Sequence, residues 1–243
     1  MKAFAVATLI ALFSTTVFAQ QQKVSPDSVF AKYFHATGGK AQWDQVKSYR
    51  LNRKYTSTNV ASYDAEITGS LAQKSLYKNE IIKGRGFGYG ISSTDSWRKV
   101  PLGSSDKVTK YQVSNLSTDK QAEMKLDLYD FLVPFLDYQN RGFIATVIGP
   151  DTYKGKAVQK VELQSKEGRY TLLFDEATGL LTQSKLLAGG EETIRDFDSY
   201  VKSAFGILYP SKIQQTEVKR KATYSVTSEL IVNATVDPAL FKR

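Results

Sequence analysis

The stretch of sequence that decides the fold runs from Thr118 to Asn140 and reads TDKQAEMKLDLYDFLVPFLDYQN. It is the longest helix-patterned segment in a chain that is otherwise patterned mostly as strands, because its apolar residues recur at helical spacing. These residues are Met124, Leu128, Phe131, Leu132 and Phe135. The segment therefore predicts a helix with an apolar face that another part of the protein must cover.

The ends and the polar side of this helix can also be predicted. Thr118 and Gln121 match a capping box that starts the helix, and Pro134 predicts a break that opens a second short helical piece. Acidic residues lie at helical spacing opposite the apolar stripe, which predicts that they form its solvated side: Glu123, Asp127 and Asp130.

Two structures are consistent with a broken apolar helix beside a sheet. The helix is either a lid over a binding face or an ordinary core helix that packs permanently on the sheet. The pattern by itself favours the ordinary core helix. The function depends on which of the two is right.

The composition is typical of one folded, sheet-rich domain. The chain has 243 residues, of which 42% are hydrophobic and 23% charged, so a sizeable core is possible and there is no signature of disorder. No shift in composition marks a linker. The absence of cysteine excludes disulfides, thiolate metal sites, a cysteine nucleophile and a lipid-modified N-terminal cysteine.

Residues 1–19 have the features of a secretory signal peptide: Lys2, an apolar run from Ala3 to Phe13, and a cleavage site near Ala19. A mature domain of residues 20–243 is therefore expected outside the cytoplasm, with at most peripheral membrane contact because no later apolar run is long enough to cross a bilayer. The formal net charge is 33 − 24 = +9, and +8 after Lys2 is removed. This excess suits phosphate headgroups or an acidic partner, but scattered surface lysines explain it equally well.

A helix, a Gly38-Gly39 turn and a short helix at residues 40–46 are predicted before the first strand. From residue 48 onward apolar and polar residues alternate, as in Tyr49, Leu51 and Tyr55, which predicts antiparallel strands with one buried face. Arg53 has the same parity as these three residues. A charge facing inward is expensive unless it is paired, so Arg53 is either a strand-end residue that reaches water or a polar anchor inside a pocket.

Glycines at positions 84, 86, 88 and 90 alternate with Arg85, Phe87 and Tyr89. The spacing does not match a dinucleotide-binding fingerprint, because the third glycine is misplaced and no helix pattern follows. A strand with one bare face marks a sharp bend or a place where another group approaches the backbone. The alternatives are a strongly coiled strand, or a ligand or helix lying against the glycine face.

Several motifs resemble those of bacterial periplasmic proteins of the lipoprotein-carrier (LolA/LolB-like) superfamily, of the outer-membrane lipoprotein-sorting type. The resemblance spans nearly the whole mature chain and rests on turn and packing motifs: residues 31–40 (AKYFHATGGK) with Trp43, 153–156 (YKGK), 174–181 (FDEATGLL), 197–200 (FDSY), 206–213 (GILYPSKI) and 236–241 (VDPALF).

This resemblance implies an α+β fold that is mainly antiparallel β: a curved, incomplete β-barrel whose concave face is covered by helices. It also implies that lipid acyl chains or another greasy ligand bind there, and that an inward arginine holds the helical lid shut, a role for which Arg53 matches by parity and strand. The absence of cysteine departs from the lipidated acceptor branch. The expected ligand-binding residues are Leu51, Arg53, Tyr55, Ile67, Phe87, Tyr89, Leu128, Phe131 and Phe135.

The residues offer no convincing catalytic set, so no enzyme activity, metal or cofactor is expected. His35 is the only histidine and falls on the predicted first helix, where a surface position is expected. Asp196 and Asp198 share one strand face and fit the wet side of a strand better than a catalytic carboxylate pair. Basic and aromatic residues interleave at Arg85, Phe87 and Tyr89, but nucleic acid is not an expected ligand of an exported protein.

Two functions remain. The first is a monomeric, non-enzymatic periplasmic carrier that binds and transports a lipid, the acyl chains of a lipoprotein, or another hydrophobic ligand. The second is a cell-envelope module that senses or docks another protein with the same fold and a fixed helix. An open apolar trough under the helix favours the first function, and a filled interior favours the second.

Overall fold

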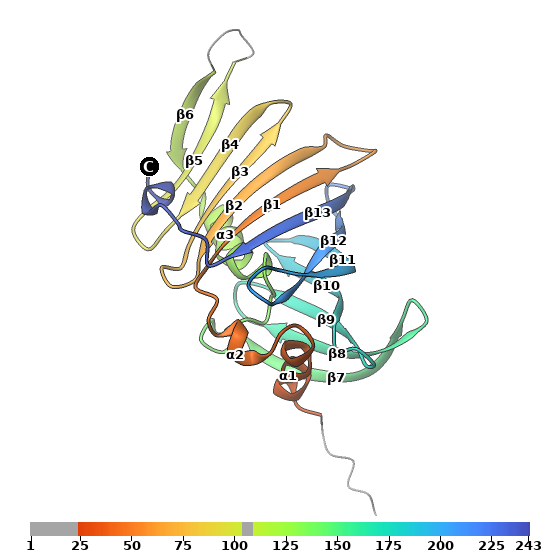
Figure 1. Ribbon diagram of the computed structural model, residues 1–243. Coiled ribbons are helices and arrows are strands. Elements are labelled where there is room, and N and C mark those ends of the chain that lie inside the picture. The colour runs from red at the N-terminus through yellow and green to blue at the C-terminus, as the bar shows by residue number, and fades with distance from the viewer. Residues whose placement is uncertain (1–23, 104–108) are drawn as a thin grey trace, which may run out of the picture.

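The computed structural model describes residues 24–103 and 109–243, so the expected signal peptide at residues 1–19 lies outside the described residues. In the described parts, thirteen antiparallel strands form one curved sheet in the order β6-β5-β4-β3-β2-β1-β13-β12-β11-β10-β9-β8-β7 (Figure 1). The strands are β1 (Ser48–Thr56), β2 (Tyr63–Ser70), β3 (Ser75–Ile82), β4 (Arg85–Ile91), β5 (Ser96–Leu102), β6 (Lys110–Asn115), β7 (Ile144–Tyr153), β8 (Lys156–Gln164), β9 (Arg169–Asp175), β10 (Leu181–Ala188), β11 (Glu191–Lys202), β12 (Leu208–Glu217) and β13 (Ala222–Val232).

Alternation along the strands gives the sheet its buried face. In β13 every second residue from Ala222 to Val232 is buried, and the residues between them are exposed. In the centre of the sheet Leu51 lies between Leu230 of β13 and Ile67 of β2, so the apolar residues of neighbouring strands meet on one side. The predicted fold class, an incomplete antiparallel barrel with few helices, is confirmed.

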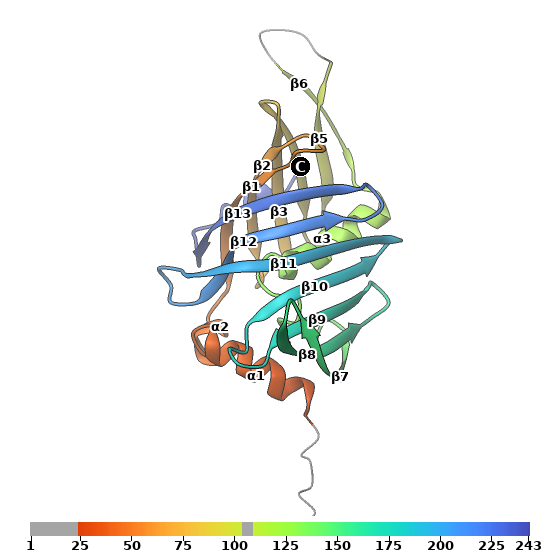
Figure 2. The ribbon, with the colours of Figure 1, turned by 90° about the vertical axis from the view of Figure 1, so that its right-hand side faces the viewer.

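Helix α3 (Thr118–Asp130) connects the two edges of the open sheet. Strand β6 forms one edge and β7 the other, and the chain between them crosses the concave side of the sheet (Figures 1 and 2). The sheet is therefore bridged by a helix instead of being closed by strand pairing. No described helix is long and apolar enough to span a membrane.

Helices α1 (Pro26–Ala36) and α2 (Lys40–Trp43) cover one end of the curved sheet (Figure 1). Ser25 caps α1 by accepting a hydrogen bond from the backbone of Ser28, and the predicted glycine turn separates the helices. Gly38 has a φ of +119°, and a Cβ placed on it would lie 2.8 Å from the carbonyl oxygen of Gly206. This turn therefore packs directly on the turn between β11 and β12.

The predicted ends of the Thr118–Asn140 helix are wrong in two respects. Ser117 is the N-cap and accepts from the Lys120 amide, whereas Gln121 donates to the carbonyl of Leu116 and does not complete a capping box. The helix ends at Asp130, and no second helical piece follows Pro134, because residues 131–142 form successive turns.

The turns after α3 are held by a side chain. The Arg141 guanidinium donates to the carbonyl oxygens of Pro134 and Leu136, at 2.7 and 3.1 Å. These bonds satisfy carbonyl groups that would otherwise need a helical partner, which explains why a turn structure replaces the expected helix.

The bare face of the glycine strand β4 points away from α3 and carries an indole ring. Trp97 of β5 lies across it, and a Cβ at Gly90 would come within 2.4 Å of the indole nitrogen. The short 3₁₀ helix η1 (Pro238–Phe241) packs on β3 and β4 next to this ring. The alternation of glycines thus makes room for a neighbouring side chain of the protein itself.

The close approach at Gly38 can be tested against its neighbour. Gly39 also has a positive φ, +94°, but a Cβ there would meet nothing within 4 Å. Both alanine variants suffer backbone strain of about 1–3 kcal/mol, but only Gly38→Ala adds a collision with backbone. In urea denaturation we expect Gly38→Ala to lose at least about 1 kcal/mol more than Gly39→Ala. Equal losses would contradict the packing of the two turns.

Candidate functional site

The candidate site is the concave face of the sheet together with α3 and the residues that follow it. Met124 and Leu128 of α3 are buried against the sheet. The chain then continues with five consecutive buried residues, Phe131 to Phe135, which we call the plug. Phe135 stacks on Phe30 of α1 with ring centroids 4.5 Å apart and planes 9° apart. The plug is thus part of the protein's own aromatic core.

The acidic side of α3 is not solvated as the sequence pattern predicted. Glu123 is exposed, but Asp127 and Asp130 are only 7% and 8% exposed. The reason is the curvature of the sheet: a helix lying inside it meets the sheet on more than one side, so the face opposite the apolar stripe is also buried.

Asp127 connects α3 to the β1–β6 half of the sheet. Its carboxylate lies 3.6 Å from the ammonium group of Lys78 on β3, which also lies 3.1 Å from Glu80. The neighbouring acids hold the pKa of Lys78 well above its ordinary value despite its burial. Lys78 therefore stays charged beneath the helix.

Asp130 connects α3 to the β7–β13 half. It lies 3.3 Å from the Arg195 guanidinium of β11 and accepts a hydrogen bond of 2.8 Å from the Tyr170 hydroxyl of β9. Arg195 in turn donates to Gln215 of β12 at 3.1 Å. Burial raises the pKa of the Asp130 carboxyl, while Arg195 acts in the opposite direction. The two aspartates together clamp α3 to both halves of the open sheet.

The sequence contains a signal for this clamp in the strand faces on which its cations lie. Lys78 has the parity of the inward-facing Leu76, and Arg195 that of Phe197. An inward cation calls for an acidic partner, and an acidic pair spaced for one helix face was available on α3. The inward parity of Lys78 and Arg195 therefore predicts the partners of the clamp, whereas helical periodicity by itself places the two aspartates in solvent.

Arg53 is buried, with 5% exposure, on the concave face. Its guanidinium lies over the ring of Phe131, 5.0 Å from the centroid, and one nitrogen lies 3.5 Å from the Tyr55 hydroxyl. Its described hydrogen bonds include none to α3. Its contact with the segment after the helix is therefore a cation–π contact with the first residue of the plug.

The other expected ligand-binding residues divide into two groups. Six of them are buried together in the main core: Leu51, Tyr55, Ile67, Leu128, Phe131 and Phe135. Tyr55 stacks on Tyr63 at 4.3 Å. Tyr89 is half-buried beneath the ammonium groups of Lys78 and Lys120, and Phe87 is half-buried outside the main core.

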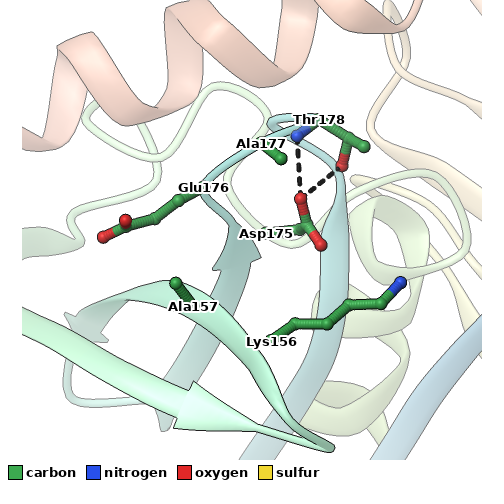
Figure 3. A pocket seen from close by; sticks show the side chains of 6 residues that line it. All are labelled: Lys156, Ala157, Asp175, Glu176, Ala177 and Thr178. Atoms are coloured by element: carbon green, nitrogen blue, oxygen red, sulfur yellow. Dashed lines mark hydrogen bonds between the residues drawn. The ribbon is translucent and has the colours of Figure 1, made fainter.

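Two surface hollows lie away from this face. One, of about 630 Å³, lies at the turn after β9, where Asp175 accepts hydrogen bonds from the amide and hydroxyl of Thr178 while Glu176 points away (Figure 3). These bonds lower the pKa of Asp175 and account for its burial as part of a turn. The second, of about 480 Å³, lies beside η1 on the glycine face of β4.

The candidates for acid–base chemistry lie apart from the concave core. His35 is exposed on α1. Asp196 accepts hydrogen bonds from Tyr153 at 2.6 Å and Gln183 at 2.7 Å, and so belongs to a local network on the other face of β11. Among the described residues, no three histidine or acidic side chains are grouped so as to hold a metal ion.

The clamp makes a prediction about stability. Asp130→Asn leaves Arg195 buried without its counter-charge, so we expect the free energy of unfolding to fall by about 3–5 kcal/mol in urea. Replacing both partners, as Asp130→Leu with Arg195→Met, should recover much of this loss because no unpaired charge remains. Glu123→Gln, at an exposed site on the same helix, serves as the control and should change stability by under about 0.5 kcal/mol. A loss no larger than the control's would refute the clamp.

Comparisons with known proteins identify the fold but not a sequence family. No family model and no curated protein matches the chain. A DUF1329 family protein from Desulfovibrio piger is 12% identical, covers 89% of this chain and 96% of its own, and has a TM-score of 0.55. A LolA superfamily protein from Nitrosomonas europaea is 11% identical over 90% of this chain and 98% of its own, with a TM-score of 0.56.

A third solved structure, described as an outer membrane lipoprotein-sorting protein domain from Vibrio parahaemolyticus, is 10% identical and covers 83% of this chain and 93% of its own, with a TM-score of 0.53. At these identities the likeness is one of fold. The resemblance expected from the turn motifs is confirmed at that level: the chain has the incomplete-barrel fold of LolA superfamily proteins.

Proposed function

We propose that the protein is a non-enzymatic binding protein of the cell envelope, of the carrier type, which binds the apolar chain of a lipid, a lipoprotein or another hydrophobic ligand. The observation that carries this proposal is that two parts of the segment covering the concave face are held in different ways. The helix is held by buried ion pairs, whereas the plug after it is held by apolar contacts. An apolar guest can replace contacts of the second kind without breaking the first.

The free-energy cost of displacing the plug is lower than the cost of displacing the plug and the helix together. Four large apolar side chains of the plug are buried: Phe131, Leu132, Val133 and Phe135. At about 1.5–3 kcal/mol each, exposing them costs roughly 6–12 kcal/mol, and an acyl chain of about 14 carbons returns roughly 11 kcal/mol at ~0.8 kcal/mol per methylene. Releasing α3 as well would break two buried ion pairs at about 3–5 kcal/mol each. The free energy gained by burying the acyl chain therefore offsets the cost of exposing the plug only if the helix stays in place.

The expected export signal and the fold support a role in the cell envelope. Proteins with this fold include a LolA superfamily protein and a lipoprotein-sorting domain. We extend the carrier role to this chain on that likeness together with the plug, and place its action in the periplasm of the exporting cell.

A second function is favoured by the close packing of the plug in the core. In this structure the space between α3 and the sheet is occupied by the protein's own side chains, and Phe135 is surrounded by aromatic rings. The interior is thus filled and not open, which is the outcome expected for a fixed helix in an envelope module that docks another protein, so the carrier function requires the plug to move. The two functions differ in whether the plug moves.

The test is to loosen the plug and measure binding of cis-parinaric acid, a fluorescent fatty acid. Phe135→Ala removes the stacking on Phe30 and should lower stability by about 3–5 kcal/mol. If the plug must leave to admit the acyl chain, the same variant should bind the probe at least about tenfold more tightly, since its closed state is weakened. Tighter binding by a less stable protein is the signature of a carrier with a displaceable plug.

Phe241→Ala provides the matched control. Phe241 is buried on η1 and lies outside the main core, so its loss should lower stability without changing probe affinity. If neither the wild-type protein nor Phe135→Ala binds the probe, and native mass spectrometry of protein from its own envelope finds no lipid, the carrier function is wrong. A single cross-linked partner in whole cells would then support the docking module.

A further inference from the structure

Three buried cations belong to the concave side of the sheet: Lys78, Arg195 and Arg53. The first two are matched by the aspartates of α3. Among the described residues, Arg53 forms no ion pair with a carboxylate, its Nε has no hydrogen-bond partner, and its one polar contact is the long one, 3.5 Å, to the Tyr55 hydroxyl. Of these three cations, Arg53 is therefore the one without a carboxylate partner among the described residues.

An unmatched buried guanidinium needs a physical explanation. Removing a charge from water is costly unless a counter-charge or several hydrogen bonds replace the solvent. The ring of Phe131 attracts the guanidinium, but a neutral ring compensates less than a carboxylate does. Arg53 is thus a buried cation that an external anion would neutralise, because the described residues do not supply one.

A second unpartnered group lies beside it. Ser228 of β13 is directly opposite Arg53 in the antiparallel register, is buried, and has a hydroxyl to which no described residue provides a hydrogen-bond partner. Side chains that face each other across such a pair lie close together on one face of the sheet. A guanidinium and a hydroxyl side by side are suitable donors for the oxygens of a carboxylate or phosphate.

The acidic groups of the same face are already engaged. Asp127 and Asp130 pair with Lys78 and Arg195, Glu80 pairs with Lys78, and Glu217 pairs with Arg220 and accepts from Gln215. They are therefore not available to Arg53 unless the clamp opens.

We propose that the ligand is an anionic amphiphile, whose acyl chain replaces the plug and whose carboxylate or phosphate accepts hydrogen bonds from Arg53 and Ser228. This inference rests on the proposed function and adds a charged head group to it. The position of Arg53 explains the coupling: the residue that covers it, Phe131, is the first residue of the plug. Displacing the plug uncovers the cation at the moment when the head group arrives.

The test compares two probes with the same chain, dodecanoate and 1-dodecanol, by calorimetry below the concentrations at which they aggregate. The wild-type protein should bind dodecanoate at least about tenfold more tightly, as expected for one charge-assisted interaction. Arg53→Met should remove this preference, and Ser228→Ala should reduce it. Lysophosphatidic acid distinguishes a phosphate from a carboxylate head, while acetate and inorganic phosphate show whether the anion binds without a chain.

The outcomes separate the two proposals. If neither dodecanoate nor dodecanol binds the wild-type protein or Phe135→Ala, the proposed carrier function fails. If both bind with equal affinity, the apolar site stands and the anion site is overturned. A preference for dodecanoate that persists in Arg53→Met also overturns the role of Arg53.

The ligand-free protein offers an independent measurement. Because Arg53 has no counter-charge to lose, Arg53→Met should leave the thermal midpoint unchanged or raise it, whereas Arg195→Met should lower it by abandoning Asp130. A fall in the midpoint of Arg53→Met as large as that of Arg195→Met, or failure of Arg53→Met to fold, would show that Arg53 has a structural partner and would overturn the inference.

Discussion

The structure depends on one constraint: the sheet does not close, and the only described chain segment that joins its two edges is the one containing α3. An open curved sheet leaves one apolar face that must be covered. The segment from β6 to β7 has to cross that face, so the connection and the cover are the same element. Asp127 and Asp130 fix where the helix lies by pairing with a cation from each half of the sheet.

These ion pairs and the plug have different physical properties, and the difference matters for function. A buried ion pair is directional and strongly destabilising when only one partner is removed, so it defines position more than it adds stability. Apolar contacts are non-directional and can be exchanged for other apolar contacts of similar area. The proposed carrier function depends on this difference, because it requires the plug, and not the clamped helix, to be exchanged for a ligand.

Much of the fold could be predicted from the sequence because its signals are local. Alternation placed Leu51 and Ile67 on one face, and the glycine pair at residues 38–39 placed the turn between α1 and α2. The burial of Asp127 and Asp130 could not be obtained from helical periodicity, since periodicity assumes that the side opposite an apolar stripe meets water. Inside a curved sheet that assumption fails, and only the parity of distant cations points to the buried acids.

The same limit applies to the segment after the helix. Pro134 correctly marked an interruption, but whether a second helix or a turn follows depends on Arg141, whose donors reach back to the carbonyls of residues 134 and 136. Such a contact is set by the final position of the chain and has no periodic signature. The membership of Phe135 in the aromatic cluster of α1 likewise depends on how the N-terminal helix meets the middle of the chain, which hydrophobicity alone does not specify.

The edge at β7 explains why a helix, and not a further strand pairing, bridges the sheet. The register between β7 and β8 shifts between Val147 and Gly149, and Pro150 has no amide to donate. Bulges and prolines of this kind disfavour continued pairing at an edge strand. Had β7 paired with β6, the interior could change only by breaking strand hydrogen bonds. Because the edges stay apart, the interior is bounded on this side by the segment containing α3, and a rearrangement of its side chains breaks no strand hydrogen bond.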